Sequence, residues 1–288
     1  MKAIFRHELS SYFTSVYAYV FAAFLLLFAG IYTMAINISS AYTDFEYVLS
    51  NMSFIFLIIV PIITMRVIAE ERRQRTDNLL YSLPFSMTDV TLGKYFALLV
   101  VFLIPVLIIG LYPIILSAFG NMNLKAAFSG LLGFYLLGAA LIAIGMFISS
   151  LTENQAVAAG LCFVVMLVNY FIVSLAAYVS STSFASFMAF TIVIILAAVI
   201  FFVMTRNGFA AAVMGLMLEA ALMILYIIKT DLFEGLFSDV MEQLSVFQRF
   251  YDMTEGIFDI RSVVYLISVA CVFVFLTVQS LEKRRWSE

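Results

Sequence analysis

Histidine, cysteine, tryptophan and proline are all scarce in this sequence. Its 288 residues include one His, two Cys, one Trp and four Pro. The single histidine, His7, excludes a metal site built from several imidazoles, and no Ser/His/Asp set can be arranged around it. Cys162 and Cys271 stand inside hydrophobic runs without paired or metal-ligand spacing, so neither a disulfide framework nor a zinc site is indicated. We expect both to pack as small apolar side chains.

Charged residues are equally sparse. They make up 11% of the chain, whereas hydrophobic residues make up 65%; a soluble domain has about 25% and about 45–50%. No soluble fold of this length buries so much apolar surface, so lipid must be its solvent. The net charge of −3 and the lack of a basic face argue against nucleic acid as a partner.

A nucleotide-binding loop is also missing. The sequence contains no G-x-x-x-x-G-K-[ST] motif, and Gly93-Lys94 is followed by Tyr95 at the start of a hydrophobic run. That position cannot cradle phosphates. We therefore expect this chain not to be an enzyme and to hold no cofactor of its own.

Hydrophobic runs are what the sequence has in abundance. About 20 apolar residues cross the roughly 30 Å core of a bilayer at about 1.5 Å per residue. Eight segments reach or approach that length, at residues 16–38, 53–69, 94–118, 127–150, 156–178, 187–204, 208–228 and 262–281. The fold is predicted to be all-α, a polytopic transmembrane helical bundle of about eight spans forming a single domain over residues 1–288. An Asn-Gly pair at 207–208 suits a tight hairpin between the sixth and seventh spans.

Lysine and arginine predict the orientation, because cytoplasmic loops retain these residues. With eight spans, both termini share a side. That side carries Lys2, Arg6, Arg66, Arg72, Arg73, Arg75, Lys94, Arg206, Lys283, Arg284 and Arg285. The opposite side carries Lys125, Lys229, Arg249 and Arg261. Both termini are thus predicted to be cytoplasmic.

Two segments outside the spans show helical apolar spacing. Residues 1–15 resemble an amphipathic helix lying in the headgroup region, the alternative being a simple extension of the first span. The loop at 229–261, predicted to be extracytoplasmic, has apolar residues at helical spacing, which suits short surface helices; the alternative is a solvated connector.

The one dense polar stretch lies at 70–93, between the second and third spans. Thr76 or Asp77 can cap a short helix that Pro84 ends. The helix would carry a stripe of Leu79, Leu80 and Leu83. Ser86-Met87-Thr88-Asp89 then has capping-box spacing. An apolar stripe with a charged rim indicates a protein-docking surface, and a solvated basic loop is the alternative.

The string EERRQRTDNLLYSLPFSMTDVTLGKYFA at 70–97 resembles the cytoplasmic loop of type-two ABC exporter permeases. FISSLTENQA at 147–156 resembles the family's second cytoplasmic turn. EGIFDIR at 255–261 and FLTVQSLEKRRW at 275–286 resemble its gliding-motility-type branch. The family's usual core has six spans, so an extra hairpin would account for eight.

This resemblance implies a coupling helix that seats in a separate ATP-hydrolysing subunit, which would bind ATP and magnesium. The implied contact residues are Glu70, Glu71, Arg72, Thr76, Leu79, Leu80, Leu83 and Pro84. It further implies a second permease chain, identical or related, and a multi-pass position in a bacterial inner or plasma membrane. The expected function is the permease subunit of an ATP-driven exporter.

Two polar residues inside spans leave alternatives open. Glu219 stands mid-span with no basic neighbour in sequence, and a buried acid in lipid is a functional candidate by default. It could line a substrate path or be protonated and bonded to another helix. Asn169 could bridge helices. Glu219 as a proton relay would indicate a secondary transporter, and a non-transporting membrane anchor is the third reading.

Overall fold

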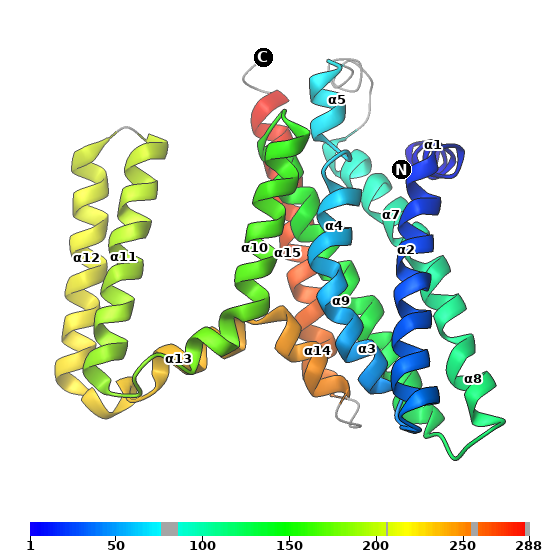
Figure 1. Cartoon of the computed structure of the whole chain (residues 1–288). Coiled ribbons are helices and arrows are strands. Elements are labelled where there is room, and N and C mark those ends of the chain that lie inside the picture. Colours follow the sequence, from blue (N-terminus) through cyan, green and yellow to red (C-terminus); the bar gives the residue numbers. More distant parts are fainter. Residues whose placement is uncertain (76–85, 206, 255–258, 286–288) are drawn as a thin grey trace. The chain divides into compact units, whose positions relative to one another are not determined.

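The computed structural model describes residues 1–75, 86–205, 207–254 and 259–285, apart from the side chains at 200 and 203–205 (Figure 1). Every regular element in these ranges is helical. The prediction of an all-α chain is therefore confirmed.

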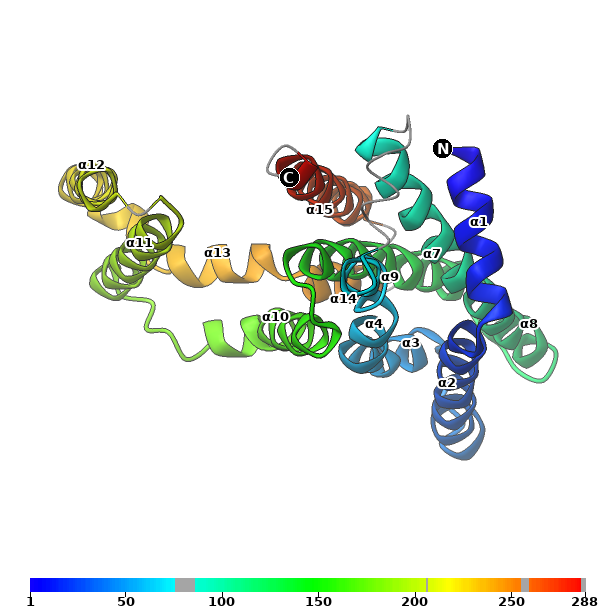
Figure 2. The ribbon, with the colours of Figure 1, turned by 90° about the horizontal axis from the view of Figure 1, so that it is seen from above.

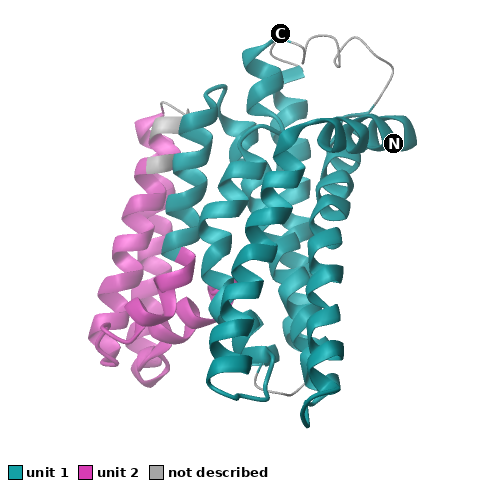
Figure 3. Ribbon diagram, turned by 45° about the vertical axis from the view of Figure 1, so that its right-hand side comes forward, with its two compact units in different colours: residues 1–168, 249–288 teal, residues 169–248 magenta. Residues whose placement is uncertain are grey.

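The chain forms two compact units (Figure 3). Unit 1 comprises Met1–Val168 and Arg249–Glu288, and unit 2 comprises Asn169–Gln248. The first part of α10 (Gln155–Ala176) and the last part of α14 (Val246–Thr254) belong to unit 1. The other helices of unit 1 are α1 (Lys2–Thr14), α2 (Val16–Thr33), η1 (Met34–Ser39), α3 (Glu46–Met52), η2 (Ser53–Ile55), α4 (Phe56–Thr64), α5 (Ala69–Arg73), α7 (Met87–Ile109), α8 (Leu111–Ser117), α9 (Leu124–Leu151) and α15 (Ile260–Arg285).

Unit 2 is built around a hairpin of α11 (Ser183–Thr205) and α12 (Gly208–Ile228). The Asn207 side chain caps α12 by accepting a hydrogen bond from the Ala210 N–H at 3.1 Å. The predicted turn signal thus starts a helix. Short helices follow in the 229–261 connection, namely η3 (Thr230–Phe233) and α13 (Leu236–Leu244).

Seven helical segments in the described ranges are long and apolar enough to cross a membrane. They are Val16–Ser39, Glu46–Arg73, Met87–Ser117, Leu124–Leu151, Gln155–Ala176, Gly208–Ile228 and Ile260–Arg285. The predicted sixth span corresponds to α11, whose described apolar part, Ser183–Val199, is shorter. The chain is a multi-pass helical membrane protein.

The second span begins at Glu46 rather than at the predicted residue 53. Its first turns carry polar residues, which suggested a loop in the sequence. The structure pairs them: the Ser53 hydroxyl donates to the Ser50 carbonyl at 2.7 Å and lies 2.8 Å from the Tyr251 hydroxyl. The Ser50 hydroxyl donates to Thr254 Oγ1 at 3.0 Å. Because tertiary partners satisfy these groups, the helix extends through them.

The core of unit 1 surrounds α9, which packs against α4, α7 and α15. Rings of Phe56 on α4, Phe102 on α7 and Phe134 on α9 meet there, with centroids 4.6–6.2 Å apart. These three side chains are at most 1% exposed. Packing rather than polarity therefore holds the helices at this level.

Residues 1–14 do not continue the axis of the first span. Ser15 has an extended backbone, with φ −95° and ψ 153°, and separates α1 from α2. Figure 2 shows α1 running across the end of the bundle, alongside α7. Its buried Ile4 faces Gly93, where an added Cβ would lie 3.0 Å from Ile4 Cγ2. That α1 lies in the headgroup region stays a prediction.

Asp259 caps the N-terminus of α15. Its carboxylate accepts hydrogen bonds from the Arg261 N–H at 3.0 Å and from the Ser262 hydroxyl at 2.9 Å. The Arg261 backbone bond, followed by the Ser262 hydroxyl, lowers the pKa of the carboxyl below its usual value. A lowered pKa in the folded state means that this stabilisation is present at neutral pH and is lost as the pH falls through that pKa.

We expect Asp259→Ala to speed amide exchange at Arg261 and Ser262 at pH 7, because an orphan N–H group loses its acceptor. The difference from wild type should be lost only in acid, as the pH falls through the lowered pKa of the Asp259 carboxyl. Hydrogen-exchange mass spectrometry measures it. Asp259→Asn is the matched control, since it keeps an acceptor and has no charge to lose. Equal protection in Asp259→Ala and wild type at pH 7 would rule out the cap.

Candidate functional site

The polar stretch predicted to dock a partner begins on α5, at the end of unit 1 that also carries α1 and the end of α15 (Figure 1). The second span breaks between Thr64 and Ala69, where the backbone turns before α5 starts. The fully buried Ser149 of α9 fills this break. Its hydroxyl oxygen accepts hydrogen bonds from the Ile68 and Ala69 N–H groups at 3.3 and 3.1 Å, and it donates to the Met65 carbonyl at 3.3 Å. One side chain thus satisfies the backbone groups that the break frees.

Arg72 attaches α5 to the far end of α9. Its side chain is 6% exposed, and its Nη1 donates to the Ser150 carbonyl. The Ser280 hydroxyl of α15 donates to the same carbonyl at 3.3 Å. Since Ser150 is near the C-terminus of α9, its carbonyl lacks an intrahelical partner and gains one here. Arg72 therefore links α5 to α9 at a point that α15 also contacts.

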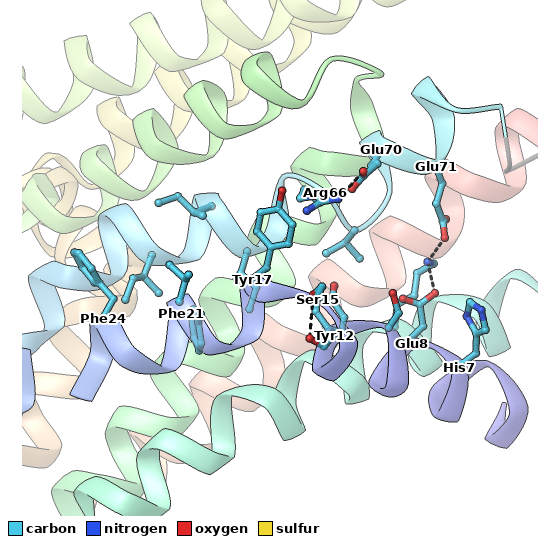
Figure 4. Close-up of a pocket in the computed structure, with 17 residues that line it drawn as sticks. His7, Glu8, Tyr12, Ser15, Tyr17, Phe21, Phe24, Arg66, Glu70 and Glu71 are labelled. Atoms are coloured by element: carbon cyan, nitrogen blue, oxygen red, sulfur yellow. Dashed lines mark hydrogen bonds and ion pairs between the residues drawn. The ribbon is translucent and has the colours of Figure 1, made fainter. Parts of the chain in front are cut away.

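Lys94 of α7 joins three helices (Figure 4). Its Nζ lies 2.7 Å from Glu8 Oε1 on α1 and is also bonded to Glu71 Oε1 on α5. Lys94 is 2% exposed, whereas the Glu8 and Glu71 side chains are 16% and 26% exposed. A buried ammonium is tolerated only when it is paired and hydrogen-bonded. The two carboxylates supply that pairing.

A second ion pair lies next to the first. The Arg66 guanidinium binds the Glu70 carboxylate through two nitrogens, with Nη2 2.6 Å from Oε1. The guanidinium also lies over the Tyr17 ring of α2, 3.8 Å from its centroid. We refer to Glu8, Arg66, Glu70, Glu71 and Lys94 as the ion-pair cluster. It ties the start of the polar stretch to α1, α2 and α7.

The Tyr12 hydroxyl of α1 belongs to the same region. Burial, and then the negative charges of Glu8 and Glu71, raise the pKa of this phenol above its usual value. Tyr12 therefore stays protonated at physiological pH. It adds no charge to the ion-pair cluster.

The third span begins at Met87, seven residues before the predicted residue 94. Ser86 Oγ accepts a hydrogen bond from the Asp89 N–H at 3.1 Å and donates to Asp89 Oδ2 at 2.9 Å. Ser86 is therefore confirmed as the N-cap residue of α7, and the Asp89 carboxylate binds the Ser86 hydroxyl rather than making the backbone bond of a full capping box. Thr76, Leu79, Leu80, Leu83 and Pro84 lie outside the described residues, so their place in a docking helix stays a prediction.

Glu70, Glu71 and Arg72 are the predicted contact residues that the structure describes, and they adjoin one another on α5. The two intramembrane candidates belong to unit 2 instead. Glu219 Oε1 accepts a hydrogen bond from Thr191 of α11 at 2.8 Å, which supports a bond to a neighbouring helix. Asn169 donates to the Leu244 carbonyl and accepts from the Val246 N–H at 3.2 and 3.0 Å. Asn169 thus bridges α10 to the junction of α13 and α14.

Sequence reasoning missed Lys94 and Glu8 as members of a cluster. Lys94 counted only towards orientation, and residues 1–15 were expected to lie in the headgroup region. The available signal was a lone lysine on the buried face of a span, preceded by a span that ends in two acids. Opposite charges at the same membrane level are natural partners.

The ion-pair cluster connects helices and shows no arrangement typical of a catalytic centre. In the described ranges no group of three or more His, Cys, Asp or Glu side chains could hold a metal ion.

Comparison with known proteins gives one family model, described as "ABC-2 family transporter protein", which matches residues 33–278. No curated protein matches the chain.

Proposed function

We propose that this chain, which belongs to the ABC-2 family of transporter proteins, receives the energy of ATP hydrolysis from a separate ATPase subunit through the stretch at 70–84. Family membership makes the chain the permease subunit of an ABC transporter, and its apolar helices make it a multi-pass membrane protein. Membership of this family favours an ABC permease over a proton-driven secondary transporter and over a simple membrane anchor.

The anchorage of α5 is the observation that carries this proposal. Glu71 connects α5 to α1 and α7 through Lys94. Arg72 and the backbone at Ile68–Ala69 connect it to α9. A force applied to the 76–85 segment therefore acts on several spans at once. In a packed bundle such a displacement moves helices as bodies.

The partner subunit would bind ATP and magnesium, and the end of unit 1 carrying α1 and α5 would face the cytoplasm of a bacterial cell. Two permease chains, identical or related, would form the complete path. Export is the direction that the sequence resemblance implies. These assignments explain why the chain has a docking stretch and no nucleotide-binding loop of its own.

The test is co-expression with the ABC ATPase encoded nearest to the gene for this chain. Leu79→Asp with Leu83→Asp should reduce co-purification and stimulated ATP hydrolysis at least about tenfold, because a charge in a hydrophobic anchor costs more than about 1.4 kcal/mol. Neither change replaces a residue of the ion-pair cluster, so membrane insertion should stay normal.

Phe119→Asp is the matched control. Phe119 is 87% exposed in the connection between α8 and α9, at the opposite end of unit 1 (Figure 1). The variant places the same kind of charge on an exposed apolar residue outside the 70–84 stretch. Wild-type co-purification by the leucine variants would show that the 70–84 stretch does not bind the ATPase.

A further inference from the structure

A cavity of about 240 Å³ lies beside the ion-pair cluster (Figure 4). It is framed by α1, α2, the end of the second span and Lys94 of α7, all within unit 1. Polar groups line one part: His7, Glu8, Ser11, Tyr12, Ser15, Arg66, Glu70, Glu71 and Lys94. Apolar groups line the rest: Val20, Phe21, Phe24, Ile59, Ile62, Ile63 and Val67, together with the Tyr17 ring. The lining is therefore amphipathic along its length.

The cavity extends about as far as one leaflet of a bilayer. From Ser15 to Phe24 the chain rises about 14 Å at about 1.5 Å per residue, close to half of the roughly 30 Å hydrocarbon core. The wall from Ile59 to Glu70 has a similar length, with its charged end on the same side as Ser15 (Figure 4). Polar and apolar parts thus follow the order of head group and acyl chain.

The apolar part opens sideways. Val20, Tyr17 and Ile62 are 56%, 48% and 48% exposed among the described residues. In a membrane these side chains meet lipid, so a chain can enter from the bilayer without crossing water. This opening distinguishes the cavity from a solvent-filled crevice.

Charge selects among possible head groups. Three carboxylates, of Glu8, Glu70 and Glu71, line the polar part, against the two cations Arg66 and Lys94. Each cation already binds cluster carboxylates. A carboxylate has about four lone-pair sites, more than the bonds from Lys94 to Glu8 and from Arg66 and Gln74 to Glu70 occupy. An incoming ammonium finds acceptors, whereas an anionic head group adds to an existing negative excess.

We propose that this cavity binds a phospholipid with a primary ammonium head group from the adjoining leaflet. The ammonium lies among the three carboxylates, and an acyl chain follows Phe21, Phe24 and Ile62 towards the middle of the membrane. The site overlaps the first residues of the proposed ATPase contact at 70–84, with which it shares Glu70 and Glu71. Its occupancy therefore bears on the helix that carries the docking segment.

The test uses the purified full chain in micelles containing equimolar phosphatidylethanolamine and phosphatidylglycerol with identical acyl chains. Native mass spectrometry counts the lipids that remain bound. Phosphatidylethanolamine should be retained on the order of tenfold more than phosphatidylglycerol, the discrimination expected from one partly shielded charge. Equal retention, or a preference for phosphatidylglycerol, would overturn the proposal.

Two matched pairs of variants locate the site. Ser11→Lys places a competing ammonium in the polar part and should abolish the preference, whereas Ser10→Lys, one residue earlier and outside the cavity, should keep it. Ile62→Trp fills the apolar part and should lower retention of both lipids at least threefold. Ile58→Trp, one turn away and 43% exposed, should not.

Indistinguishable behaviour within either pair places the bound lipid elsewhere on the protein. Retention of no lipid by wild type, with the chain running as a dimer whose interface covers α2, assigns the cavity to a second copy and overturns the proposal. The Leu79→Asp and Leu83→Asp variant should lose ATPase binding and still retain the lipid. Failure of one proposal can therefore be told apart from failure of the other.

Discussion

Replacing Lys94 with methionine is expected to lower the free energy of unfolding by about 3–5 kcal/mol at pH 7, the loss typical when one partner of a buried ion pair is removed. The ammonium is 2% exposed and lies between two carboxylates. Without it, Glu8 and Glu71 face each other with no cation between them. Thermal or denaturant unfolding of the purified protein in detergent measures the change.

Two comparisons make the Lys94 result specific. Glu8→Gln and Glu71→Gln added to Lys94→Met should recover much of the loss, because replacing a whole buried ion cluster by neutral groups is often close to neutral. Lys125→Met, an exposed lysine near the start of α9, should change stability by no more than about 0.5 kcal/mol. If Lys94→Met matches Lys125→Met, the cluster does not stabilise the fold.

Alanine at Gly138 is expected to destabilise the bundle by about 1–3 kcal/mol, the range for an overpacked core. A Cβ there would lie 2.3 Å from Cε1 and 2.5 Å from Cζ of Phe102. Phe102 is fully buried, and its ring also meets those of Phe21 and Phe56. The ring therefore has little space into which it can withdraw. Unfolding measurements under the same conditions give the difference.

Gly30→Ala is the matched control, since nothing lies within 4 Å of a Cβ at that position on α2. Helical glycine is intrinsically less stable than alanine by about 0.5–1 kcal/mol, so the control should be neutral or slightly stabilising. Phe102→Leu combined with Gly138→Ala should be less destabilising than the sum of the two single changes. Strict additivity would show that a clash with the Phe102 ring is not the cause.

The lengths of the hydrophobic runs predicted the spans well, because a helix needs about 20 apolar residues to cross a bilayer. Seven of the eight predicted segments correspond to helices long and apolar enough to span a membrane, and the other corresponds to α11. The start of the second span was misplaced because Ser50 and Ser53 are paired by Thr254 and Tyr251, from a distant part of the chain. The sequence around residues 46–53 does not show that these distant residues will be hydrogen-bond partners.

The ion-pair cluster could not be predicted from the sequence for the same reason, because its members are far apart in the chain. Glu8 and Lys94 are 86 residues apart in sequence, and Glu71 and Lys94 are 23 apart. Only the turn at Ser15, which directs α1 across the bundle, brings the first pair together. By contrast, the Ser86 N-cap could be predicted, because all its groups lie within one turn of helix.

The length of the second span also bears on how far the proposed ATPase-binding stretch would stand from the lipid. Glu46–Arg73 has 28 residues, with a turn between Thr64 and Ala69, whereas about 20 helical residues cross roughly 30 Å of hydrocarbon. The surplus emerges as α5, which extends beyond the level of α1 in Figure 1. The 5 residues of α5, about 7 Å of helix, would hold the proposed ATPase-binding stretch away from the acyl chains. An ATPase approaching it would need no lipid-binding surface of its own.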